Sequence, residues 1–126
     1  MSIWGIAAIA AAGGVGAIAR FLVDSSVPGK SSTPLALLIV NLSGSFAIGI
    51  VLGLAPLLPE GLSLVLSVGF LGGYTTFSTA SLRTFELISK RQWWPAFITG
   101  VGQLVAAVFL TLGGMAIASL ISSAVG

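Results

Sequence analysis

Four apolar stretches, each long enough to cross a bilayer as a helix, constrain this chain more than any other feature. They are predicted at about residues 3–23, 34–54, 62–89 and 95–122. A helix needs about 20 mostly apolar residues to span the hydrocarbon core. Only 6% of the 126 residues are charged, against roughly 25% in a soluble domain. The sequence therefore predicts an all-α membrane protein in which residues 1–126 form a single membrane domain.

The residue types that are missing exclude several function classes. The chain has no Cys and no His, so it has no disulfide, no thiolate metal site and no His proton shuttle. Asp24, Glu60 and Glu86 lie at or near predicted helix ends. A proton-coupled exporter of the small multidrug-resistance type normally needs a buried carboxylate or His. That class stays as the alternative function, a helix bundle without transport is a third possibility, and no enzyme is expected.

The five basic residues predict how the chain is oriented in its membrane. Lys30 follows the first helix and Arg20 lies near its end, whereas Lys90 and Arg91 follow the third helix and Arg83 lies near its end. The opposite side of the membrane receives no Lys or Arg. Because basic loops stay in the cytoplasm, both termini are expected outside. The net charge of +2 is explained by this topology better than by a nucleic-acid-binding patch.

The segment GFLGGYTTFSTAS, residues 69–81, is unusual for a membrane helix. It carries three glycines and five Ser or Thr hydroxyls. Gly69, Gly72 and Gly73 allow a helix to unwind, and unwinding frees backbone carbonyls and N–H groups that need partners. The hydroxyls that follow can cap a restarted helix. The segment therefore predicts a third helix that is broken at its centre.

Three further polar side chains fall within the predicted spans. Arg20 lies near a helix end, where it either extends to the interface or attracts anions to an aqueous vestibule. Asn41 lies in the middle of the second span, where its amide either bonds a neighbouring helix or donates to a passing solute. Gln103 holds a comparable position in the fourth span. This polar inventory consists mainly of hydrogen-bond donors, which suit an anion.

The motifs GFLGGYTTFST, GGVGAIAR and NLSGSF together resemble the Fluc (CrcB) family of fluoride channels. The resemblance covers all four predicted helices, and the first motif is its specific part. It implies a passive, fluoride-selective channel in the inner membrane of a prokaryote that relieves fluoride toxicity. It also implies an antiparallel dimer of four-helix subunits within membrane lipid, with two fluoride pores and one structural sodium ion at its centre.

The resemblance also implies individual roles along the fluoride path. Asn41 matches an amide on that path, and Phe77 matches a phenylalanine whose ring edge, the positive part of its quadrupole, faces fluoride. Ser78 and Thr79 match hydroxyls near the path, and Arg20 matches an arginine at the aqueous vestibule. Apart from the motif, Phe77 would be interpreted as a packing residue.

Two further matches and three departures complete the comparison. Gly72 and Thr75 match the residues whose backbone carbonyls hold the sodium ion. Leu37 replaces a threonine, Ala80 a second phenylalanine and Arg83 a glutamate of the family pattern. Homodimers of the family insert in both orientations, which a strong charge bias opposes. We therefore expect a heterodimer, in which a paralogous subunit of opposite orientation supplies the missing phenylalanine and glutamate. The alternative is that Ala80 and Arg83 mark one inactive pore.

Overall fold

A computed structural model describes residues 2–27 and 34–126. Within them, helices cover four stretches long and apolar enough to cross a membrane, Ile3–Ser26, Leu35–Leu57, Leu62–Ser89 and Trp93–Val125. The prediction of an all-α protein with four spans is thereby confirmed. Lys30, part of the topology prediction, lies outside the described residues.

The first two spans end later than the sequence predicted. Helix α1 covers Ile3–Ser26 rather than ending near residue 23. Its last two serines donate their hydroxyls to the carbonyls four residues earlier, which gives these side chains partners on their own helix. Helix α2 covers Leu35–Leu54, and the 3₁₀ turn η1, Ala55–Leu57, extends it.

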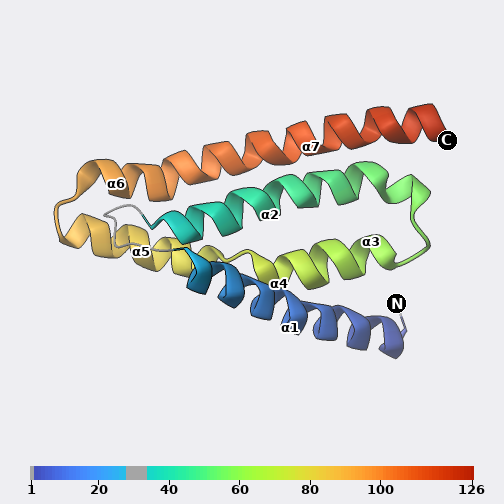
Figure 1. Ribbon diagram of the computed structural model, residues 1–126, viewed down its shortest axis with the longest axis horizontal. Coiled ribbons are helices and arrows are strands. Elements are labelled where there is room, and N and C mark those ends of the chain that lie inside the picture. Colours follow the sequence, from blue (N-terminus) through green and yellow to red (C-terminus); the bar gives the residue numbers. More distant parts are fainter. Residues whose placement is uncertain (1, 28–33) are drawn as a thin grey trace.

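The third span consists of successive helical segments. The short helix α3, Leu62–Leu64, passes into the π-helical segment η2, Val65–Leu71, and then into α4, Gly72–Tyr74. Helix α5 covers Phe77–Ser89. In Figure 1, α3 lies toward the end of the molecule that holds both termini, α4 lies near the middle, and α5 lies toward the other end.

The fourth span begins two residues before the sequence prediction. Helix α6 covers Trp93–Phe97, with Pro95 in the first turn, where the missing N–H has no helical partner to lose. The π-helical segment η3, Ile98–Gly102, follows, and α7 covers Gln103–Val125. Figure 1 shows α2 and α7 running side by side along the molecule.

Glycines bring the helices into backbone contact. A Cβ atom on Gly49 would overlap the Thr111 carbonyl of α7, and one on Gly114 would lie 2.6 Å from the Phe46 carbonyl oxygen of α2. On the other side, a Cβ on Gly73 would overlap the Gly13 carbonyl of α1. Small residues allow such contacts between membrane helices. The structure thus explains why glycine is frequent in all four spans.

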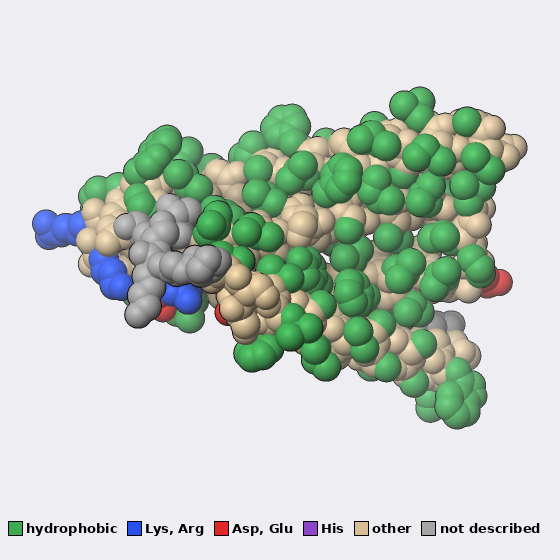
Figure 2. All heavy atoms as spheres, in the orientation of Figure 1, with side chains coloured by type: hydrophobic (Ala, Val, Ile, Leu, Met, Phe, Trp, Pro, Cys, Tyr) green, Lys and Arg blue, Asp and Glu red, His purple; other side chains and the backbone are tan. Residues whose placement is uncertain are grey.

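The surface is that of a membrane protein. Many large apolar side chains are more than half exposed, and hydrophobic side chains cover the length of the helices in Figure 2. The Lys and Arg side chains of the described residues gather at one end, opposite the two termini. An apolar flank with a charged end fits a bilayer with an aqueous boundary.

Candidate functional site

Two threonines separate helices α4 and α5. Helix α4 ends at Tyr74, and Thr75 is extended, with φ −82° and ψ 162°. Thr76 is extended as well, with φ −149° and ψ 121°, and α5 begins at the next residue. Successive extended residues cannot continue the helical hydrogen-bond ladder. The Thr75 N–H still donates to the Leu71 carbonyl at 2.9 Å, but the Thr76 N–H has no such helical bond and needs a partner from elsewhere in the chain.

The glycines of this region lie in helical segments, which differs from our expectation that they unwind. Gly69 belongs to η2 and Gly72 and Gly73 belong to α4. A Cβ on Gly69 would lie 2.9 Å from the Cβ of Ala12 in α1. Two of the three glycines therefore serve the close approach of α1, while the extended backbone falls on the threonines that follow.

The side chain of Asn41 takes up the backbone groups of Thr76. Its Nδ2 donates to the Thr76 carbonyl oxygen at 2.9 Å, and its Oδ1 accepts from the Thr76 N–H at 2.8 Å. Nδ2 also donates to Oε1 of Gln103 at 2.6 Å. Of the two roles that the sequence left open for Asn41, these contacts show bonding to neighbouring segments. Both of its N–H groups have protein partners.

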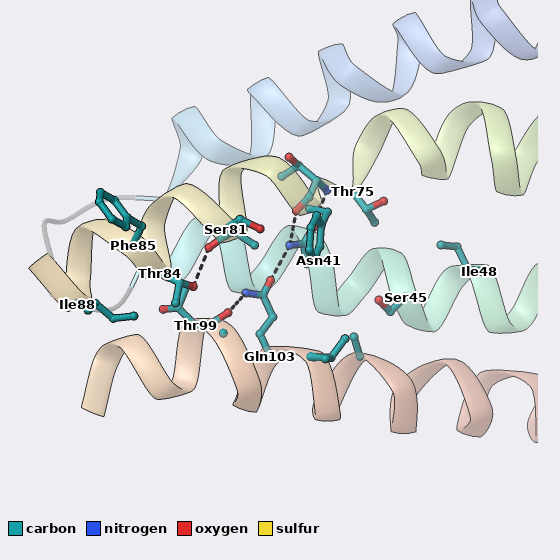
Figure 3. Close-up of a pocket in the computed structure, with 16 residues that line it drawn as sticks. Asn41, Ser45, Ile48, Thr75, Ser81, Thr84, Phe85, Ile88, Thr99 and Gln103 are labelled. Carbon is teal, nitrogen blue, oxygen red and sulfur yellow. Dashed lines mark hydrogen bonds between the residues drawn. The ribbon is translucent and has the colours of Figure 1, made fainter. Parts of the chain in front are cut away.

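Gln103 links this contact to the fourth span. Its side chain is only 5% exposed, and its Nε2 donates to the Thr99 carbonyl oxygen at 2.5 Å. Figure 3 shows Gln103 reaching from its helix toward Asn41. The Thr99 hydroxyl is also buried, and it has no hydrogen-bond partner within the described part of the chain.

The start of α5 is capped by a hydroxyl cluster. Thr76 Oγ1 accepts from the Thr79 N–H at 3.2 Å, the bond that an N-cap side chain normally makes. The same oxygen lies 3.1 Å from Thr79 Oγ1 and 3.4 Å from Ser78 Oγ. The hydroxyls predicted to cap a restarted helix do occupy that position, with Thr76 as the cap.

A groove of about 600 Å³ lies beside the break. It is bounded by α2, α5 and the η3–α7 part of the fourth span, and its walls are mainly apolar. Its polar lining residues are Asn41, Ser45, Thr75, Thr76, Ser81, Thr84, Thr99 and Gln103. An apolar groove with a few polar groups is typical of a site for a small solute.

The structure brings some of the predicted pathway residues together. Asn41 and Phe77 both line the groove, and the Phe77 side chain is 83% exposed. Ser78 and Thr79 are exposed in the first turn of α5. Arg20 lies on α1, is half-buried and does not line the groove.

The three departures from the family pattern occupy different surroundings. Leu37 is buried, with 7% of its surface exposed. Ala80 lines the groove one turn beyond Phe77. Arg83 is exposed and forms an ion pair with Glu86, its Nη1 lying 3.7 Å from Oε2.

Sequence reasoning did not single out several members of the groove, among them the threonines Thr84 and Thr99. Threonine in a helix commonly bonds its own backbone, as Thr84 does to the Ala80 carbonyl at 2.8 Å. Nothing in the local sequence distinguishes Thr99 from such a residue. Spacing could have indicated it, because Thr99 and Gln103 are four residues apart and share a helix face.

Comparison with known proteins gives a consistent family match. Residues 7–115 match the model of the family described as CrcB-like protein, Camphor Resistance (CrcB). A protein of Leifsonia xyli named fluoride-specific ion channel FluC 1 is 42% identical over 122 residues, covering 90% of this chain and 89% of that protein. Proteins named fluoride-specific ion channel FluC from Nitrobacter winogradskyi and Pyrococcus horikoshii are 39% and 34% identical. The match to the Nitrobacter protein covers 92% of this chain and 96% of that protein. The match to the Pyrococcus protein covers 90% of this chain and 94% of that protein.

Proposed function

Because this chain belongs to the CrcB-like family, we propose that it is a passive, fluoride-selective ion channel that lets fluoride leave the cytoplasm. The observation that carries the proposal is the similarity, over 90% of the chain, to a protein named as a fluoride-specific channel. Neutral HF enters cells in acid surroundings and ionises inside. A membrane potential that is negative inside favours exit of the anion by roughly 2.3 kcal/mol per 100 mV. Conduction of this kind needs no catalytic group.

The fluoride path is proposed to pass the start of α5. Phe77, Ser78 and Thr79 supply a ring and two hydroxyls around the break. Asn41, whose two N–H groups bond the Thr76 carbonyl and Gln103, would donate to fluoride by exchanging one of these bonds. Donors and a positive ring edge can replace the water around a small anion without a full counter-charge. Arg20, on the end of α1 nearer the basic loops, is proposed to attract anions to the aqueous entrance.

The hydrogen bonds at the break support a structural sodium ion. In an unbroken helix the Thr76 N–H would donate to the Gly72 carbonyl, and the Thr79 N–H to the Thr75 carbonyl. Here the first donates to Asn41 and the second to the Thr76 hydroxyl. The carbonyls of Gly72 and Thr75 thus lose their helical donors, and carbonyl oxygens suit a hard cation. We propose that these two carbonyls hold sodium, which would neutralise their partial negative charge at the centre of a dimer.

The working unit is proposed to be an antiparallel dimer with a paralogous subunit. Ala80 leaves the groove without an aromatic ring at that position, and Arg83 places a cation where the family pattern has an acid. A partner of opposite orientation could contribute both groups to the shared pores. The exposed apolar side chains offer surface for that partner and for lipid.

The chain is a membrane protein, and we propose the inner membrane of a prokaryote as its location. The termini lie at one end of the molecule, and the Lys and Arg side chains of the described residues lie at the other. Basic residues are retained in the cytoplasm. The proposed topology therefore has both termini outside and the loops after the first and third helices inside.

Growth and transport assays test the proposal together. A bacterial strain that lacks its own fluoride channel should tolerate fluoride when it expresses this chain, with its paralogous partner where the host encodes one. Purified protein in liposomes should release fluoride without a proton gradient, which a proton-coupled exporter would require. Absence of efflux from the chain alone and from the complex would overturn the channel. Full efflux from the chain alone would overturn the heterodimer only.

A further inference from the structure

A continuous chain of hydrogen bonds joins the fourth span to the break in the third. It runs from the Thr99 carbonyl to Gln103 Nε2, and from Gln103 Oε1 to Asn41 Nδ2, over 2.5 and 2.6 Å. Asn41 then binds both backbone groups of Thr76. Figure 3 shows this path between the helices that bound the groove.

The π-helical segment η3 explains why Gln103 points this way. The backbone N–H of Gln103 donates to the carbonyls of Ile98 and Gly100. The Thr99 carbonyl, which would be its partner in an α-helix, instead accepts from the Gln103 side chain. A π-helical turn of this kind is frequent at functional sites. Here the Thr99 carbonyl, which the turn releases from the backbone N–H of Gln103, holds the Nε2 atom of Gln103 in place.

The orientation of Gln103 in turn reinforces that of Asn41, which the two backbone groups of Thr76 also favour. With Nε2 held by Thr99, the atom that faces Asn41 is the acceptor Oε1. Only the donor end of Asn41 can meet it, so Oδ1 turns to the Thr76 N–H. The reversed amide of Asn41 would place its Oδ1 against two other acceptors, Gln103 Oε1 and the Thr76 carbonyl, and its Nδ2 against the Thr76 N–H. Burial makes such unpaired contacts costly.

We propose that Gln103 is a positioning residue, which holds Asn41 in one amide orientation and thereby fixes the backbone of Thr76 at the start of α5. Because Thr76 immediately precedes Phe77, Gln103 also determines where that ring stands beside the groove. Gln103 acts through Asn41 and need not touch the transported ion. Its effect on transport rests on the proposed function, whereas its effect on Thr76 does not.

Amide hydrogen exchange of Thr76 tests the positioning directly, in detergent-solubilised full-length protein. Gln103→Met keeps the length of the side chain and removes both amide groups. Thr76 should then exchange roughly 2- to 10-fold faster, which corresponds to the loss of one hydrogen bond. The matched control is Thr111→Val, which removes another hydrogen bond between the fourth span and α2, from Thr111 Oγ1 to the Ser45 carbonyl at 3.0 Å. That variant should leave the exchange of Thr76 unchanged.

Two further variants separate positioning from general loosening. In an Asn41→Leu background, Gln103→Met should add no further acceleration, because the link is already broken. Gln103→Glu should restore slow exchange at low pH, where the protonated carboxyl has a donor and an acceptor in the places of the amide. Equal acceleration by Gln103→Met and Thr111→Val, or additive effects with Asn41→Leu, would overturn the proposal. The pH dependence of Gln103→Glu keeps the test decisive if Gln103→Met does not fold.

Transport provides the second readout. Fluoride efflux by Gln103→Met should fall roughly 2- to 10-fold relative to Thr111→Val, measured in the same liposomes as the wild type. If the wild type itself gives no efflux, the proposed function fails, while the exchange result still decides the role of Gln103. Faster exchange with unchanged efflux would overturn the claim that this position affects the path.

Discussion

Replacing Gly16 by alanine tests the packing of α1 against the third span. The added Cβ would overlap the Phe70 carbonyl oxygen and lie 2.9 Å from the Phe70 carbonyl carbon and 2.9 Å from the Tyr74 nitrogen. Ordinary contact needs 3.4 to 4 Å. All of these atoms are backbone, so no rotamer change can relieve the overlap and α1 must move away.

The expected cost follows from two opposing effects. Overpacking costs about 1–3 kcal/mol, and rigid backbone places this site near the upper limit. Alanine returns about 1 kcal/mol because it favours the helix over glycine. The net loss of unfolding free energy for Gly16→Ala should therefore be about 2 kcal/mol.

Gly14→Ala provides the matched control on the same helix. Among the described residues, 2–27 and 34–126, no atom outside the local helix backbone lies within 4 Å of a Cβ at that position. Only the gain in helix propensity remains, up to about 1 kcal/mol. Both variants would be unfolded reversibly by titrating SDS into mixed micelles, with helicity followed by circular dichroism. Equal stability of the two variants would refute the close approach of α1 to Phe70 and Tyr74.

Four other substitutions have defined outcomes. Asn41→Leu leaves three partly buried polar groups without their partner and should lower the unfolding free energy by about 2–4 kcal/mol in the same titration. Thr76→Val removes the cap of α5 and should cost about 1 kcal/mol. Phe77→Ile should abolish fluoride efflux from liposomes, whereas Phe109→Ile, at a side chain that is 69% exposed on α7, should not; equal loss in both would contradict a specific role. Arg83→Ala should change stability by less than about 1 kcal/mol, because its ion pair is exposed.

The positions of the membrane spans were predictable because length and apolarity decide them. The expected boundaries at Ile3, Leu62 and Ser89 agree with the structure. The end of α1 was not predictable from hydropathy, since the polar residues Asp24, Ser25 and Ser26 continue the helix and both serine hydroxyls bond its carbonyls. Local hydrogen bonds of this kind leave no mark on an apolarity profile.

The glycines of residues 69–81 show why a motif can be located correctly and interpreted incompletely. A missing side chain permits both an unwound backbone and a close helix contact. Gly73 packs against the carbonyl of Gly13, a partner 60 positions away that the local sequence cannot identify. The hydroxyls of Thr76 and Thr79 were easier to interpret, because capping is local.

The network around Asn41 was predictable only in part. A polar amide in the middle of a span predicts some partner, and Gln103 was recognised as its counterpart in the fourth span. The actual contact joins residues 62 positions apart and depends on the π-helical turn in η3. Such turns are rare and occur mostly as single-turn bulges within α-helices, so the apolar pattern of the fourth span does not indicate one.

Anion efflux from liposomes tests the central claim most directly. Vesicles loaded with fluoride or with chloride would receive the chain with its paralogous partner, and an ion-selective electrode would record release after valinomycin sets a potassium potential. The account predicts rapid loss of fluoride, little loss of chloride, and loss of fluoride transport in Phe77→Ile. Equal release of both anions, or fluoride release that persists in Phe77→Ile, would contradict a selective path at the start of α5.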